Sequence, residues 1–177
     1  MSATPEVAST AAPAPDTGPL APLARAAFVI SGSALVALVA VQAWQVLARY
    51  GFNDAPGWTE PTALLLLSTA MCLGAAGGVH QGAHFGFYVL REHARPPIKR
   101  MLEDFADGVA ALLGGVLAYW GAVLLIDGFG VPMAGAPLPQ SANYLPMSTG
   151  GALMLVFALD RIRRRHLRAP ARSGAPG

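Results

Sequence analysis

Residues 108–126 read GVAALLGGVLAYWGAVLLI, nineteen positions without an aspartate, glutamate, lysine or arginine. The hydrocarbon core of a bilayer is about 30 Å thick and is crossed by about 20 apolar helical residues, so this stretch is long enough to span a membrane. Three more stretches lack these charged residues: 26–48 (23 residues), 61–90 (30 residues) and 128–159 (32 residues). Four such stretches in one chain predict four membrane-spanning helices.

The two longest stretches exceed a single crossing, and their sequences indicate where each helix lies. Small and polar residues return at 77–86, and four prolines interrupt the first part of the last stretch. Proline removes a backbone donor and breaks a helix. The predicted helices are, in chain order, Arg25–Tyr50, Thr59–Val79, Leu102–Asp127 and Asn143–Arg164.

The predicted fold class is an all-α integral membrane protein, because helices satisfy every backbone hydrogen bond internally in lipid. The four-helix transmembrane domain is expected over residues 23–168. The alternative is a soluble helical bundle, whose helices would carry a charged stripe opposite each apolar stripe. Residues 64–67 and 109–126 carry no such stripe. Residues 1–22, rich in alanine and proline, and residues 169–177 are predicted to be flexible tails.

The composition of the whole chain agrees with a membrane protein. Of its 177 residues, 54% are hydrophobic and 12% are charged, whereas soluble domains carry about 25% charged residues. The net charge of +2 does not provide the basic face that nucleic-acid binding requires, so no nucleic-acid partner is expected. The single cysteine, Cys72, excludes a disulfide framework within the chain and a thiolate metal cluster.

The basic residues predict the orientation of the helices. With four crossings, the N-terminal end, the loop between the second and third helices and the C-terminal end share one side of the membrane. The twelve lysines and arginines then divide eleven to one, with Arg49 alone on the other side. Short loops rich in lysine and arginine stay in the cytoplasm, so both termini are expected there. The arginines within 161–168 are expected to contact anionic lipid headgroups.

A short amphipathic helix is predicted before the third crossing. Apolar residues recur at positions 98, 101, 102 and 105, the spacing of one helical face, and charged residues fill positions 99, 100, 103 and 104. Such a helix lies at the membrane surface, and a docking face for a partner is the alternative interpretation. Two charge pairs within the helix are expected, Lys99 with Glu103 and Arg100 with Asp104.

A polar stripe marks the first predicted helix. Gln42, Gln45 and Arg49 are separated by three and four residues, so they share one face, and such a face can hydrogen-bond another helix inside the membrane. Small residues that allow close helix approach cluster at 74–78 and 114–121. Both patterns suit either packing within the chain or an interface with a larger membrane protein. No charged residue falls at mid-membrane, which argues against an ion-coupled transporter made of this chain alone.

Two histidines form a candidate ligand pair. His80 and His84 share a face of a continuous helix, and pairs of this kind bind metal ions or haem iron. No carboxylate or third histidine lies nearby on that helix, and the motif HExxH is absent. A structural role at the level of the lipid headgroups is the simpler interpretation. A haem- or quinone-binding membrane anchor of an oxidoreductase is the alternative function.

The loop between the first and second helices carries the most specific sequence signal. Residues 49–61 read RYGFNDAPGWTEP, which contains the turn-forming dipeptides ND and PG. Thr59 suits the N-cap of the second helix, and Glu60 suits its first turn, where a negative charge is favoured. Arg49 leaves the first helix at the same level and is placed to pair with Glu60. Trp58 lies where an interfacial aromatic belt is expected.

The motif RY-x-FN at residues 49–53, followed by W-x-E at residues 58–60, resembles a signature of the DctQ-like small permease subunits of tripartite ATP-independent periplasmic (TRAP) transporters. Residues 74–85 are similar to the LGAA…G-x-HI stretch of that family, and residues 144–154 to its YL-x-P-x-GG-x-L entry into the last helix. The resemblance covers about residues 44–165. The chain departs from the pattern at three positions, where the family usually has a second glutamate, a basic residue and an aspartate: Pro61, His80 and Tyr88.

The resemblance implies a small membrane subunit of a sodium-coupled secondary transporter that imports an organic acid across the bacterial inner membrane. In that family a large membrane subunit binds substrate and sodium and moves, and a periplasmic binding protein delivers the substrate. The small subunit is a scaffold and docking surface, so neither enzymatic activity nor a cofactor is expected in this chain, and sodium coupling is expected in the large subunit. The residues expected to contact partners or to support the fold are Gln42, Gln45, Arg49, Trp58, Glu60 and His84.

Overall fold

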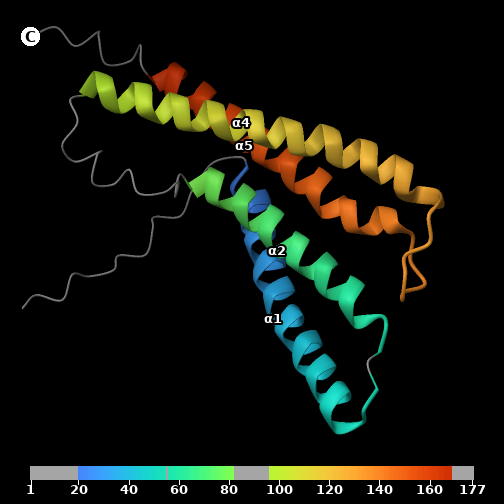
Figure 1. The fold of residues 1–177 in the computed structure, drawn as a ribbon. Coiled ribbons are helices and arrows are strands. Elements are labelled where there is room, and N and C mark those ends of the chain that lie inside the picture. The colour runs from blue at the N-terminus through green and yellow to red at the C-terminus, as the bar shows by residue number, and fades with distance from the viewer. Residues whose placement is uncertain (1–19, 55, 82–95, 169–177) are drawn as a thin grey trace, which may run out of the picture.

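The computed structural model describes residues 20–54, 56–81 and 96–168. It contains four long helices (Figure 1), each long and apolar enough to cross a membrane, which confirms the predicted all-α fold class. In chain order the helices are α1 (Ala21–Gly51), α2 (Thr59–Gln81), α4 (Pro96–Asp127) and α5 (Leu145–Arg168), and two short 3-10 helices, η1 (Gly128–Gly130) and η2 (Gln140–Tyr144), precede α5.

The ends of α1 follow from local chemistry. A proline lies in its first turn, where backbone N–H groups have no acceptor within the helix, so the missing N–H of proline costs no hydrogen bond. At the other end, the N–H groups of Phe52 and Asp54 both donate to the Ala48 carbonyl, at 3.1 and 3.2 Å. Asn53 has a positive φ of 53°, a conformation that asparagine tolerates better than most residues. These bonds end the helix and turn the chain toward α2.

The helix α4 corrects the prediction of a separate amphipathic helix before the third crossing. Residues 96–127 form one continuous helix, so the amphipathic segment is the beginning of the membrane-spanning helix itself. No proline follows Pro97 within α4, so no residue there removes a backbone hydrogen-bond donor. At the junction, the side chain of Asp107 is paired with arginines of α5. The remaining helices differ from the predicted bounds by only a few residues at each end.

The helices pack in the order α1, α2, α5, α4, so that α1 packs mainly on α2, and α2 packs on α5. We call the end that holds residues 52–58 and 128–144 the hairpin end, and the opposite end the terminal end. The core lies at the terminal end, where buried side chains from all four helices meet. These are Ala24, Ala76, Val79, Ala110, Phe157 and Ala158. The helices spread apart from there toward the hairpin end, most visibly α1 away from α4 and α5 (Figure 1).

Glycine allows α4 and α5 to touch through their backbones. A Cβ atom at Gly151 would lie 2.6 Å from the Ala118 nitrogen and 2.9 Å from the Gly114 oxygen, both on α4. On the next face of α5, a Cβ at Gly150 would lie 2.6 Å from the Cβ of Cys72 on α2. The two adjacent glycines therefore let α5 approach both of its neighbours, as small residues do in membrane helix packing.

Candidate interface at the hairpin end

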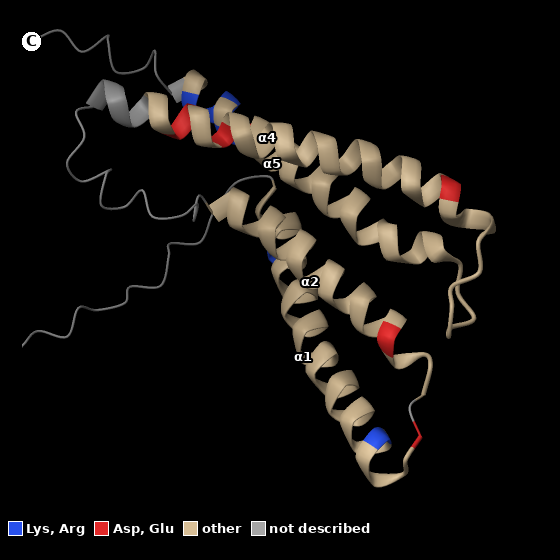
Figure 2. Cartoon of the chain, viewed as in Figure 1, with Lys and Arg blue, Asp and Glu red and all other residues tan. Residues whose placement is uncertain are grey.

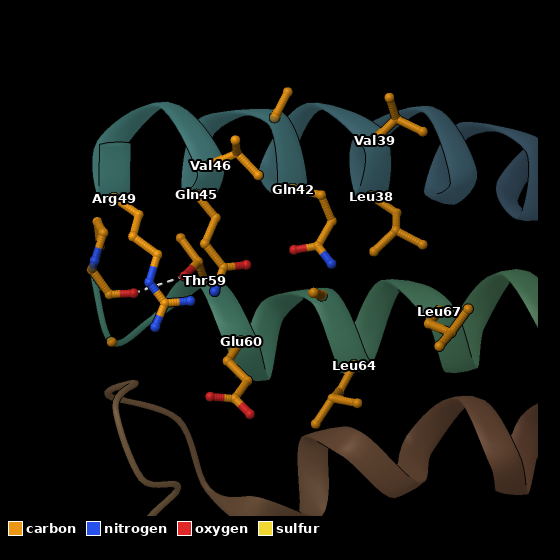
Figure 3. Close-up of a pocket in the computed structure, with 14 residues that line it drawn as sticks. Leu38, Val39, Gln42, Gln45, Val46, Arg49, Thr59, Glu60, Leu64 and Leu67 are labelled. Carbon is orange, nitrogen blue, oxygen red and sulfur yellow. Dashed lines mark hydrogen bonds between the residues drawn. The ribbon is translucent and has the colours of Figure 1, made fainter. Parts of the chain in front are cut away.

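A groove lies between α1 and α2 toward the hairpin end (Figure 3). Its volume is about 940 Å³. Beyond the innermost lining residues, Leu38 and Leu67, the Ser31 hydroxyl of α1 donates to the Ala70 carbonyl of α2 at 2.7 Å. The lining residues are Leu38, Val39, Gln42, Ala43, Gln45, Val46, Arg49, Pro56, Gly57, Thr59, Glu60, Ala63, Leu64 and Leu67.

The polar stripe of α1 lines this groove. Gln42, Gln45 and Arg49 all contribute to its α1 wall, so the structure places the three predicted residues together. In Figure 3 their side chains point from α1 toward α2. A second helix bonded to this stripe would therefore have to enter between α1 and α2.

The expected pair between Arg49 and Glu60 does not form. Glu60 lies in the first turn of α2, as predicted, and also lines the groove. Its carboxylate points away from α1, however, whereas the Arg49 guanidinium lies between the two helices (Figure 3). Both side chains are exposed, and neither forms an ion pair with another residue in the described part of the chain. The Arg49 cation is therefore unpaired between the two helices, and the Glu60 carboxylate points away from it.

The turn before α2 is anchored differently from the prediction. Thr59 is fully buried, and its hydroxyl donates to the Pro56 carbonyl at 2.7 Å instead of accepting from the first turn as an N-cap would. Trp58, the residue before it, is 43% exposed. The tryptophan is thus presented on a turn whose position is fixed by the buried threonine.

The two loops of the hairpin end meet at a pair of glycines. Gly135 has a φ of +83°, and a Cβ there would lie 2.4 Å from the Gly57 oxygen, so any side chain would push the loops apart. The longer loop is closed by two backbone hydrogen bonds of 2.9 Å, from Met133 to Leu138 and from Gln140 to Val131. Together the loops form a continuous surface that includes Trp58.

A cluster of charges crosses helices at the terminal end. Arg161 on α5 contacts Asp107 on α4 at 3.3 Å (Nε to Oδ1) and donates to the Val79 carbonyl of α2 at 3.1 Å. Arg165 contacts Asp107 at 2.7 Å (Nη2 to Oδ2) and also pairs with Asp104 and with Glu103. Asp107 is buried, so its charge needs these partners. The cluster ties the ends of α2, α4 and α5 together.

This cluster was not predicted from the sequence, where the arginines of α5 were expected to contact lipid headgroups. In the sequence, only the spacing of these residues indicates the cluster. Asp104 and Asp107 share one face of their helix, and Arg161 and Arg165 share one face of theirs. The side chains of Lys99 and Arg100, the expected partners within α4, lie outside the described side chains. Figure 2 shows that acidic and basic residues are confined to the ends of the helices, with none along their middles.

Of the two candidate histidine ligands, only His80 falls among the described residues; His84 lies outside them. The His80 ring packs against Phe157 with ring centroids 5.0 Å apart. No group of three or more histidine, cysteine or acidic side chains suited to a metal ion occurs among residues 20–54, 56–81 and 96–168. The described surroundings of His80 are those of a packed aromatic residue.

Comparison with known proteins identifies the family. The family model described as tripartite ATP-independent periplasmic transporters, DctQ component, matches residues 38–168, which is more than half of the chain. The chain belongs to the DctQ family. A search of curated proteins found no match.

The DctQ match covers the groove lining, the two loops of the hairpin end and the charge cluster. It begins at Leu38, within the α1 wall of the groove, and ends at Arg168, the last residue of α5. The protein is therefore a small membrane subunit of a TRAP transporter and not an enzyme. DctQ proteins are components of the inner membrane, and as a family they associate with a large membrane subunit and a periplasmic binding protein.

Proposed function

We propose that this DctQ-family subunit supports sodium-coupled import of an organic acid, as the scaffold and docking partner of a large permease subunit and a periplasmic binding protein. The observation that carries the proposal is the family match over residues 38–168. The distribution of charge supports it, because the long stretches 26–48, 61–90, 108–126 and 128–159 carry no acidic or basic residue. Ion-coupled transport relies on ionisable or polar groups inside the membrane. We therefore assign sodium binding to the large subunit.

The hairpin end is proposed to face the periplasm. The eleven-to-one division of basic residues supports this orientation, since the positive side of a membrane protein stays in the cytoplasm. The arginines of α5, from Arg161 to Arg168, lie at the terminal end. In this orientation the surface formed by the two loops, with Trp58 exposed on it and Glu60 exposed beside it, meets the periplasmic binding protein. Tryptophan is enriched among the residues that dominate binding at protein interfaces.

The rigidity of the terminal end supports a scaffold role. The charge cluster around Asp107 and the backbone contact at Gly151 hold α2, α4 and α5 in one arrangement. Large apolar side chains stay exposed on the outer faces of α1 and α4, among them Val36 and Leu112. Such surfaces face lipid or another membrane protein.

Reconstitution tests the proposed function. Proteoliposomes that contain this chain, its large subunit and a sodium gradient are expected to take up a radiolabelled organic acid when the periplasmic binding protein is added outside. Vesicles with the small chain alone are expected to show only background uptake. Transport by the isolated chain would contradict the proposal.

A further inference from the structure

We propose that the groove between α1 and α2 binds one phospholipid of the periplasmic leaflet through its phosphate. The phosphate lies at Arg49 and an acyl chain runs inward past Leu38 and Leu67. The inference rests on the membrane orientation proposed above, but it does not depend on what is transported or on whether sodium drives transport.

The groove has the polarity order of a phospholipid. A helix rises about 1.5 Å per residue, so Gln45 lies about 6 Å and Gln42 about 10 Å deeper than Arg49. Deeper still, the walls are formed by apolar residues, with Leu38 about 16 Å from Arg49. The sequence from the surface inward is thus cation, amide and hydrocarbon. A phospholipid presents phosphate, ester carbonyls and acyl chain in the same order, and glutamine N–H groups donate to carbonyls.

The Arg49 guanidinium is the feature of the groove that recognises the phosphate. Arg49 is the one basic residue of the hairpin side in the sequence, and its guanidinium forms no ion pair with another described residue. Guanidinium groups bind phosphate through two parallel hydrogen bonds. The Glu60 carboxylate points away from α1 and does not share the space between the helices with Arg49 (Figure 3). One unpaired cation complements the phosphate that every phospholipid carries.

The taper of the groove favours a lipid chain over a helix of another subunit. About 10 Å beyond Leu38 and Leu67 the groove has closed, because α1 and α2 are in contact there: a Cβ at Gly74 would lie 2.8 Å from the Ser31 hydroxyl oxygen. A helix with side chains is about 10–12 Å across and cannot follow a space that narrows to direct contact. A flexible hydrocarbon chain can. The groove volume of about 940 Å³ lies within the range of sites that hold small ligands.

Native mass spectrometry with defined lipids tests the site. The full chain is purified in a mild detergent, stripped of lipid and titrated with phosphatidylethanolamine or phosphatidylglycerol, alone and as the complex with its large subunit. We expect one phospholipid of either kind to bind. Arg49→Gln is expected to weaken its binding about tenfold, the loss of one hydrogen bond to a charged group. Glu60→Gln changes a carboxylate that points away from Arg49 and is expected to leave lipid binding unchanged.

A matched pair of phenylalanine variants tests the location. Ala63 lies in the α2 wall of the groove, so Ala63→Phe fills the space and is expected to abolish binding of the single lipid. Ala40 is exposed and lies outside the groove lining, so Ala40→Phe adds the same side chain elsewhere and is expected to bind lipid as the wild type does. The Arg49→Gln variant alters an exposed side chain and reports on the site even if Ala63→Phe unfolds.

Three results would overturn the inference. The first is equal lipid affinity in wild type and Arg49→Gln, and the second is retention of the lipid by folded Ala63→Phe protein. The third is efficient cross-linking of a Gln45→Cys variant to the large subunit through a short linker, which would place a helix in the groove. Because lipid binding is measured without substrate or sodium, a failure of transport in reconstituted vesicles leaves the outcome of this experiment unaffected.

Discussion

Substituting Gly151 by alanine tests the backbone contact between α4 and α5. The added methyl group would lie 2.6 Å from the Ala118 nitrogen and 2.9 Å from the Gly114 oxygen. Favourable contacts between non-bonded heavy atoms lie near 3.5–4.0 Å, so the helices must separate by about 1 Å to accept it. Both obstructing atoms belong to the backbone of α4, so no side-chain rotation relieves the clash.

The magnitude follows from two opposing terms. Overpacking of a tight interior site destabilises a fold by about 1–3 kcal/mol. Alanine in place of glycine inside a helix stabilises the helix by up to about 1 kcal/mol. The net loss for Gly151→Ala is therefore about 1–2 kcal/mol, which lowers the unfolding midpoint by about 2–8 °C for a chain of this size. Gly115→Ala is the matched control, since its nearest neighbouring atom lies 4.0 Å away, and it is expected to leave the midpoint unchanged or raise it.

The single cysteine provides the assay. Cys72 is partly buried where α2 meets Gly150 of α5. A thiol-reactive fluorophore therefore labels it faster when heating separates the helices, and the midpoint of labelling against temperature measures stability in detergent. A midpoint for Gly151→Ala equal to or above that of Gly115→Ala would refute the close backbone contact.

Two further predictions concern the charged cluster and the hairpin end. Asp107→Asn is expected to lower the midpoint by about 2–8 °C, because it removes a buried carboxylate shared by two arginines that are themselves partly exposed, a loss of about 1–2 kcal/mol. Asp160→Asn, which breaks a pair within α5, is the control and is expected to change stability by only a few tenths of a kcal/mol. Trp58→Ala and Glu60→Ala are each expected to weaken binding of the periplasmic protein to nanodiscs containing the subunit pair about tenfold, with an unchanged unfolding midpoint. Surface plasmon resonance measures this affinity, and normal binding together with normal uptake in both variants would count against the proposed docking surface.

The four helices were predictable because the membrane imposes one simple constraint on sequence. A crossing needs a long stretch without charge, and the chain has four of them. The error at residues 98–105 has a physical cause. An amphipathic pattern shows which face of a helix is apolar, but not whether the helix bends before it enters the membrane. Here Asp107 is held by arginines of α5, so the helix continues straight through the junction.

The candidate site was predictable only in part because side-chain direction depends on how two helices cross. The spacing of Gln42, Gln45 and Arg49 places them on one face from sequence alone, but it does not show that this face turns toward α2. The same rotation leaves Arg49 and Glu60 apart although the loop brings them to the same level (Figure 3). Pairing between α4 and α5 around Asp107 depends likewise on the relative rotation of two helices distant in sequence.

Reconstituted uptake tests the central claim most directly. Vesicles containing the large subunit with the binding protein and a sodium gradient are compared with and without this chain. Sodium-dependent uptake of an organic acid is expected only when this chain, the large subunit and the binding protein are all present. Uptake that is equally fast without this chain, or that persists with this chain alone, would contradict the assignment of a non-catalytic scaffold subunit.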